Sequence, residues 1–261
     1  MLQLLKNLYA TYRKKLLIKW PYYFDKLRGK KIFKTKDLKF YADKPYHNHI
    51  ARALKKDKYE DEVTKEWLKE LPGKKCIFDI GGFNGYFGLI AAVKNPEAKV
   101  FIFEPDPINA RHIEKNIEIN NLKNAKLIQA AVSDKQGELV FGGASGGTGA
   151  KIGKGEQKVK AITLDDFIKQ ENSSPDLIKM DIEGAETLAI KGAKSLLEET
   201  QNLTIILEVH FDFLKEFGSS EEELFSLINQ GGDFACEDLE DRNKATYHVK
   251  LKKCYQQEKQ T

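Results

Sequence analysis

Four ionisable side chains near the ends of predicted strands could exchange a proton with a bound hydroxyl group. Asp181 and Glu183 follow one short apolar run, and Glu208 and His210 close the next one. In open α/β sheets the carboxyl ends of parallel strands meet at the edge where ligands bind, so we expect these four groups to surround one crevice. A hydroxyl that attacks as a nucleophile must lose its proton, so each group is a candidate general base.

Lys179 lies inside the first of these runs, 176–180, where a charged side chain is costly to bury. Lys179, Asp181 and Glu183 are spaced by two residues, which places them on one face of the strand and at its exit. Two interpretations are open: the charges form a structural salt-bridge cluster, or they form a catalytic site. We favour the catalytic site, with Lys179 as a member, because the charges emerge at the ligand-binding edge.

The general base stays open among these candidates. His210 has the ordinary pKa closest to neutrality, which suits proton transfer at physiological pH. The carboxylates of Asp181, Glu183 and Glu208 could instead hold a divalent metal ion, because hard cations prefer oxygen ligands. We predict a site without metal, because carboxylates can act as bases unaided.

A glycine-rich turn follows the apolar run 76–80 and has the spacing Asp79-x-Gly81-x-x-x-Gly85. Glycine is needed where the backbone turns sharply or lets a ligand approach closely. Glu104 ends the next predicted strand, where an acid can accept both hydroxyls of a ribose. The turn lacks the G-x-G-x-x-G spacing of dinucleotide sites. An aspartate at the strand end repels a pyrophosphate and attracts a sulfonium, so the two turns predict a site for S-adenosylmethionine.

The elements that must position these residues are short apolar strands alternating with helices. The predicted strands are 76–80, 99–103, 126–132, 176–180 and 203–209, and the predicted helices are 86–93, 108–120, 185–198 and 221–229. Continuous apolar strands alternating with helices are typical of a parallel sheet covered on both faces. The predicted fold class is therefore α/β, with a doubly wound, mostly parallel Rossmann-like sheet.

Residues 137–163 interrupt this alternation with two predicted strands, 138–141 and 158–162, around a glycine-rich loop at 142–155. The loop lacks the phosphate-loop spacing and does not precede a helix. Two interpretations of it stay open, a mobile lid over the acceptor and a plain flexible loop. The tail 247–252 alternates like an edge strand.

A basic, partly helical N-terminal extension, 1–72, precedes the predicted catalytic domain, 73–261. The extension has more lysine and arginine than acidic residues, whereas the rest of the chain is net acidic. Residues 1–20 have apolar side chains at helical spacing, which predicts an amphipathic helix. This helix packs on the core or on a partner subunit, or it docks peripherally on a membrane. Residues 57–71 predict a second helix, which Pro72 ends.

The composition also bears on the cellular location. No apolar run approaches the length that spans a bilayer, and the N-terminus lacks the features of a signal peptide. The three cysteines are an odd number without paired short spacing, which argues against a disulfide framework or a zinc module. We therefore expect a cytoplasmic protein, with peripheral contact at the inner face of the membrane as the alternative for residues 1–20.

Five segments resemble the FkbM family of methyltransferases. They are DIGGFNGYFGLIAA (79–92), FEPDPINARHIEKNIEINN (103–121), AAVSD (130–134), ITLDDF (162–167) and IKMDIEGAE (178–186). They occur in the family's order and approximate spacing, and the last two are the most specific. The resemblance implies an S-adenosylmethionine-dependent O-methyltransferase that acts on a hydroxyl of a sugar, glycan or natural product.

The resemblance also implies a set of cofactor contacts. They are Asp79, Gly81, Gly82, Gly85 and Tyr86 at the methionine part, Glu104 and Asp106 at the ribose, and Ala131, Val132 and Ser133 beside the adenine. Asp181 matches a position of the family's motif, which favours it among the candidates for the general base. One departure is Phe83, which stands where many members carry Asn, and Asn84 replaces that amide in part.

Two other functions are weighed against a small-molecule or glycan methyltransferase. An RNA methyltransferase would use the basic extension to bind phosphates. The chain has no Asn/Asp-Pro-Pro-Tyr segment and no Pro-Cys nucleophile, so we expect no nucleic-acid partner. A non-catalytic cofactor-binding protein at the membrane is the third hypothesis, and the set Asp79, Glu104 and Asp181 argues against it. The identity of the acceptor does not follow from the sequence, and a homo-oligomer stays open.

Overall fold

The computed structural model describes residues 32–35, 37–41, 60–142, 151–153, 155–242, 244 and 246–254. The chain divides into two compact units, Met1–Tyr59 and Glu60–Thr261. The helix predicted over 1–20 and most of the glycine-rich loop lie outside the described residues. The described part of the first unit is an antiparallel pair of strands, β1 (Ile32–Lys34) and β2 (Lys39–Tyr41).

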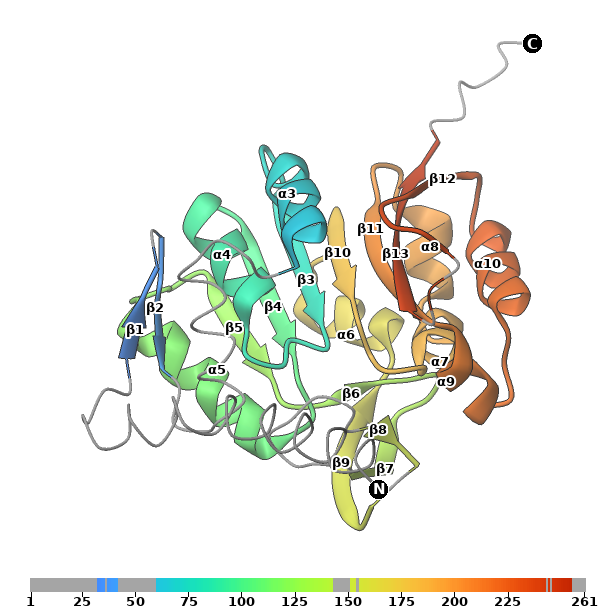
Figure 1. The fold of residues 1–261 in the computed structure, drawn as a ribbon, viewed down its shortest axis with the longest axis horizontal. Helices are drawn as coiled ribbons and strands as arrows, with labels where there is room; N and C mark the ends of the chain where they lie inside the picture. The colour runs from blue at the N-terminus through green and yellow to red at the C-terminus, as the bar shows by residue number, and fades with distance from the viewer. Residues whose placement is uncertain are drawn as a thin grey trace, which may run out of the picture. The chain divides into compact units, whose positions relative to one another are not determined.

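The second unit is built on a seven-stranded sheet (Figure 1). In spatial order its strands are β12 (Phe234–Asp238), β13 (Thr246–Lys253), β11 (Thr204–His210), β10 (Leu177–Met180), β3 (Cys76–Ile80), β4 (Lys99–Phe103) and β5 (Ala125–Ile128). The strands from β11 to β5 are parallel, and β13 is antiparallel to both of its neighbours. The predicted α/β class with a mostly parallel sheet is confirmed.

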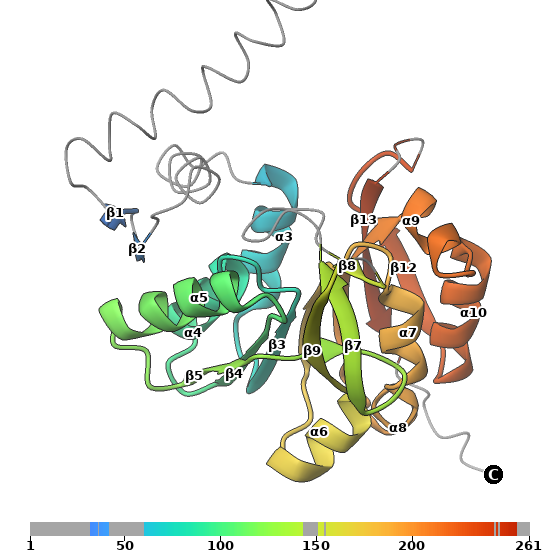
Figure 2. The same cartoon turned by 90° about the horizontal axis from the view of Figure 1, so that it is seen from below.

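Helices cover both faces of this sheet (Figure 2). One face carries α3 (Asp61–Glu70), α4 (Tyr86–Lys94) and α5 (Pro107–Ile119), and the other carries α6 (Leu164–Glu171), α7 (Glu186–Lys191), α8 (Lys194–Glu199) and α10 (Glu221–Gln230). The short helix α9 (Phe211–Glu216) follows β11 directly. Trp67 of α3 is fully buried, and its indole N–H donates to the Phe87 carbonyl oxygen at 3.1 Å, so α3 belongs to the second unit.

A four-stranded sheet lies outside the central one. It consists of β6 (Ala131–Val132), β9 (Gln157–Ile162), β7 (Gly137–Gly142) and β8 (Lys151–Ile152). The third predicted strand, 126–132, is therefore wrong as one element, because the chain leaves the central sheet after Ile128 and β6 pairs with β9 instead.

Two further predictions are wrong in detail. The helix predicted over 185–198 is two helices, because it is interrupted at Gly192, where a Cβ would collide with the backbone carbonyl of Ser133. The tail strand β13 is not at the edge of the sheet, since β12 pairs with its outer side. Among the described residues, no helix is long and apolar enough to cross a membrane.

Candidate active site

Alternation along the strands sorts the side chains of the central sheet onto two faces. On β11, Leu207 and Val209 belong to the apolar cluster that faces α6–α8. Glu208 and His210 occupy the alternate positions of the strand. Successive side chains of a strand point to opposite faces, so Glu208 and His210 lie on the face that α3 and α4 cover. Lys179 of β10 has the same orientation, because its ammonium lies over the ring of Phe87 in α4.

The turn after β3 is held against the neighbouring strands at two places. The backbone N–H groups of Gly81 and Gly82 both donate to the Phe103 carbonyl oxygen, at 3.0 and 2.9 Å. Gly81 has φ +84°, and a Cβ there would overlap the carbonyl oxygen of Asp181. Only glycine combines this dihedral with this approach, so the first turn and the exit of β10 lie in direct contact.

Asp79 is 2% exposed and lies beneath this turn. Its carboxylate accepts a hydrogen bond from the backbone N–H of Gly88 at 2.7 Å, which satisfies a free donor in the first turn of α4. Burial raises the pKa of Asp79 to about 7, although the Gly88 hydrogen bond and the Lys179 charge act in the other direction. The structure thus gives Asp79 a role in holding the glycine-rich turn and the helix that follows it.

Glu104 brings the first two turns together. Its carboxylate accepts the backbone N–H of Phe83 at 2.7 Å and that of Asp106 at 2.9 Å, so the end of β4 contacts the glycine-rich turn. Glu104 is 5% exposed, and burial raises its pKa to about 8. Asp106 is also buried, and its side chain caps α5 by accepting from the backbone of Ile108 and Asn109. The proximity predicted for these turns is therefore present.

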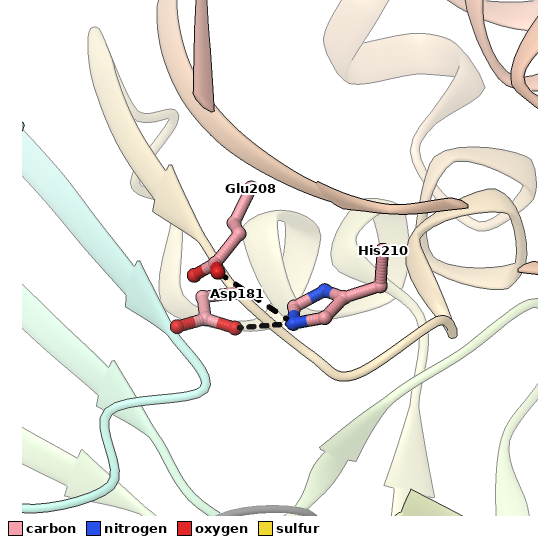
Figure 3. A group of neighbouring side chains, drawn as sticks. All are labelled: Asp181, Glu208 and His210. Carbon is pink, nitrogen blue, oxygen red and sulfur yellow. Dashed lines mark ion pairs between the residues drawn. The ribbon is translucent and has the colours of Figure 1, made fainter. Parts of the chain in front are cut away.

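A carboxylate–histidine cluster occupies the carboxyl edge of β10 and β11 (Figure 3). His210 Nε2 lies 3.5 Å from Glu183 Oε2, 3.7 Å from Glu208 Oε1 and 3.8 Å from Asp181 Oδ1. On the other side of the ring, Nδ1 hydrogen-bonds to Oε1 of the fully buried Glu186 at 3.2 Å. The four predicted proton-transfer residues are thus brought together around one imidazole nitrogen.

Charge and burial shape the pKa values in this cluster. Burial, with the charge of Asp181, raises the pKa of Glu208. Burial also acts to raise the pKa of Asp181, but the charge of Lys179 and a hydrogen bond from Glu208 lower it overall. Burial acts to lower the pKa of His210, but the hydrogen bond with Glu186 and the nearby carboxylates outweigh it and raise the pKa to about 9. The cluster therefore retains protons that isolated acids would release.

Lys179 is 1% exposed and stands between two acids. Its register partner in β3 is Asp79, and its Nζ lies 3.9 Å from Asp181 Oδ2. Among the described residues, Nζ has no hydrogen-bond partner. Burial acts to lower the pKa of Lys179, but the charges of Asp181 and Glu208 raise it overall. Lys179 is thus a buried cation adjacent to the cluster.

Sequence reasoning missed two members of this site. His248 faces Glu208 across the antiparallel pair β11–β13, with 3.2 Å between His248 Nε2 and Glu208 Oε2. Its Nδ1 lies 3.2 Å from Glu240 Oε2. The alternation of 247–252 placed His248 on one face, but only the strand pairing identifies its partner. Glu186 could have been suspected from its place in the IKMDIEGAE segment.

The residues predicted beside the adenine lie in and next to the outer sheet. Ala131, Val132 and Ser133 are buried, and the first two form β6 of the outer sheet. The backbone N–H of Ser133 donates to the carbonyl oxygen of Ile162 next to that strand. Their contacts therefore serve the outer sheet, and their role at the adenine stays a prediction. Tyr86 begins α4, directly after the glycine-rich turn.

Some of these residues also have the composition of a metal site. Asp181, Glu208 and His210 each offer one ligand atom, and these atoms lie within 4.8 Å of one another. The side chain of Asp181 is 31% exposed, whereas those of Glu208 and His210 are 15% and 7% exposed. Asp181 is therefore the member that solvent or a bound acceptor reaches most readily.

The amino-acid sequence that builds this site matches a known protein family. Residues 79–235 match the family model described as the methyltransferase FkbM domain. Hexuronic acid methyltransferase AglP of Haloferax volcanii is 26% identical over 155 residues, covering 58% of this chain and 62% of AglP. The 2-O-methyltransferase NoeI of Sinorhizobium fredii is 30% identical over 147 residues, covering 48% of this chain and 60% of NoeI. The chain thus spans about three fifths of the length of these relatives.

Among solved structures, the precorrin-6y C5,15-methyltransferase of Geobacter metallireducens is similar to this chain with a TM-score of 0.45. It is 17% identical, and the match covers 75% of this chain and 88% of that protein.

Proposed function

The chain belongs to the FkbM methyltransferase family, and on that premise we propose that it transfers a methyl group from S-adenosylmethionine to a hydroxyl of a sugar or glycan. The names of AglP and NoeI, a hexuronic acid methyltransferase and a 2-O-methyltransferase, support a sugar hydroxyl as the acceptor. The observation that carries the proposal is the placement of Glu104 and the carboxylate–histidine cluster around one glycine-rich turn.

The residues at this turn suit the cofactor. Each oxygen of Glu104 accepts one backbone N–H, and a carboxylate has further lone pairs for two ribose hydroxyls. Hydroxyls that donate to Glu104 would favour its charged form and so lower its pKa again. At Gly81 and Gly82 a Cβ would collide with Asp181 and Ile102, so these glycines let the turn pack closely against β4 and the exit of β10. When bound, the cofactor supplies an electrophilic methyl group on its sulfonium.

The cluster at β10 and β11 is the proposed destination of the acceptor's proton. A sugar hydroxyl is a weak nucleophile until a base takes its proton. Asp181 is the most exposed of the acids that face His210, so we place the acceptor hydroxyl against it. Asp181 would accept this proton beside Glu183, Glu208 and His210, and the buried cation Lys179 would balance the negative charge of the cluster.

Calorimetric titration with S-adenosylmethionine and with NAD tests the cofactor assignment. We expect only S-adenosylmethionine to bind, and Glu104→Ala to weaken binding by roughly tenfold, or about 1.4 kcal/mol. Incubation with uronic acids and hexoses should then yield S-adenosylhomocysteine. Equal affinity for NAD, or unchanged affinity in Glu104→Ala, would overturn the assignment.

We also propose a cytoplasmic location. The three cysteines, Cys76, Cys236 and Cys254, are free, which suits a reducing compartment. The division into a basic extension, 1–72, and a methyltransferase domain, 73–261, stays a proposal, with α3 packed on the domain. Membrane contact through residues 1–20 stays a prediction, because these residues lie outside the described part of the chain.

A further inference from the structure

Three side chains of the cluster each present one atom to a common point (Figure 3). His210 Nε2 lies 3.8 Å from Asp181 Oδ1 and 3.7 Å from Glu208 Oε1, beyond the range of a good hydrogen bond. Ligands bonded to a cation at about 2.0–2.6 Å lie roughly 2.8–3.7 Å apart at right angles, and farther apart at wider angles. These two spacings, together with the 4.8 Å within which all three ligand atoms lie of one another, suit three ligands of one cation.

Each of these side chains has its other polar atom next to a buried neighbour. Asp181 Oδ2 lies 3.9 Å from Lys179 Nζ, and Glu208 Oε2 lies 3.2 Å from His248 Nε2. His210 Nδ1 bonds to Glu186, which also accepts the backbone N–H of Gly184. A carboxylate on the far nitrogen of a histidine is the usual way in which proteins orient a metal ligand. The outer contacts thus direct Asp181 Oδ1, Glu208 Oε1 and His210 Nε2 toward one point.

One buried nitrogen adds a separate observation. Among the described residues, Lys179 Nζ has no hydrogen-bond partner, although the side chain is 1% exposed. It faces Asp181 of the cluster, and a buried polar group without a partner is costly. A ligand or ordered water that enters the cluster would give this nitrogen a partner.

The local charge is also unbalanced. Four carboxylates surround His210, whereas Lys179 is the one lysine or arginine that contacts the cluster among the residues described. One of these acids, Glu186, is fully buried and the other three are 15–31% exposed, and such an excess of acids in a largely enclosed place favours bound protons or a bound cation. A divalent cation would bring the cluster close to neutrality without removing Lys179, which lies against the outer oxygen of Asp181.

We propose that Asp181, Glu208 and His210 bind a divalent transition-metal ion of the Mn²⁺ type. One imidazole nitrogen with two carboxylate oxygens favours such an ion over Ca²⁺ or Mg²⁺, which prefer oxygen alone. This inference departs from the metal-free site that the sequence predicts. Its consequence for catalysis rests on the proposed function: the ion would take the acceptor hydroxyl in an open position and lower the pKa of that hydroxyl. Because Asp181 would then be a ligand, the neighbouring Glu183 would accept the proton.

Mn²⁺ titration of the full-length, EDTA-treated protein tests the proposal, with free Mn²⁺ measured by electron paramagnetic resonance. We expect saturable binding at one ion per chain, and weaker binding by roughly tenfold or more in Asp181→Asn and in His210→Gln. Asp212→Asn is the matched control, because its side chain is 69% exposed and pairs with Lys215 on α9. Circular dichroism verifies that each variant is folded.

The outcomes separate this inference from the proposed function. Absence of saturable Mn²⁺ binding in the wild type overturns the metal site, as does affinity unchanged in both site variants. Full methyl transfer after chelation would remove the metal's catalytic role and leave the proposed function standing. Mn²⁺ binding by a protein that does not bind S-adenosylmethionine would leave the metal site standing and overturn the proposed function.

Discussion

Replacing Asp79 with Asn should stabilise the folded protein, and the gain should grow as the pH rises. Burial raises the pKa of Asp79 from 3.8 to about 7, so the folded chain retains a proton that the unfolded chain releases. The native state is therefore disfavoured progressively between these pH values, and the cost is complete above the higher one. A difference of about 3 in pKa corresponds to about 4 kcal/mol at full effect.

The contacts of Asp79 let this substitution remove the charge while keeping the hydrogen bond to Gly88. Asn retains an oxygen that can accept the Gly88 N–H, now made at 2.7 Å, while it removes the charge. The charged groups that act on Asp79 are Lys179, Asp181 and Glu60, and none of them is changed. The net gain is therefore the difference between burying a carboxylate and burying an amide.

Urea unfolding followed by circular dichroism at about pH 5 and about pH 8 measures the effect. Linkage predicts that the free energy of unfolding of Asp79→Asn, relative to wild type, is higher by about 2–3 kcal/mol at the alkaline pH than at the acidic one. In the control Asp212→Asn, at an exposed position, the free energy of unfolding should change by the same small amount at both pH values. A stability difference that does not depend on pH, or one that favours wild type at the alkaline pH, would refute this account of Asp79.

Two further predictions concern packing, and thermal unfolding measures both. Gly81→Ala should destabilise the protein by roughly 3 kcal/mol or more, because φ is +84° and the new methyl meets the Asp181 carbonyl; a loss under about 1 kcal/mol would show that the turn relaxes. Phe78→Ala should cost about 3–5 kcal/mol, because the ring is fully buried against Phe101 and Phe167. An unchanged melting temperature would mean that this core collapses around the cavity.

Local sequence signals were sufficient for the strands that build the site. The runs at 76–80 and 99–103 are the observed β3 and β4 to the residue, because each is a continuous apolar stretch that turn residues end. The third strand failed because 126–132 is equally apolar throughout. Its break after Ile128 depends on the pairing of β6 with β9, which lies about thirty residues away along the chain.

In the site, too, the contacts that depend on local residue spacing were predictable, and the contact that depends on strand register was not. Spacing by two placed Lys179 with Asp181, and Glu208 with His210, on one face of each strand, and parallel strands brought the pairs together. His248 was missed because its contact with Glu208 depends on the register of β11 against β13. That register follows from the whole apolar face of β13, and no short motif encodes it.

The two faces of the central strands divide stability from chemistry. One face of the neighbouring strands β3, β10, β11 and β13 is apolar and packs on the second helical layer, through Phe78, Ile178, Leu207 and Val249. The opposite face carries polar groups in the same four strands, namely the buried Asp79, Lys179 and His248 and the partly buried Glu208. A charge there costs free energy unless another charge or a ligand compensates it, so that face contributes little to folding by itself. Substitutions on the apolar face should therefore lower stability, whereas Asp79→Asn on the polar face should raise it, because the fold clearly disfavours the charge of Asp79.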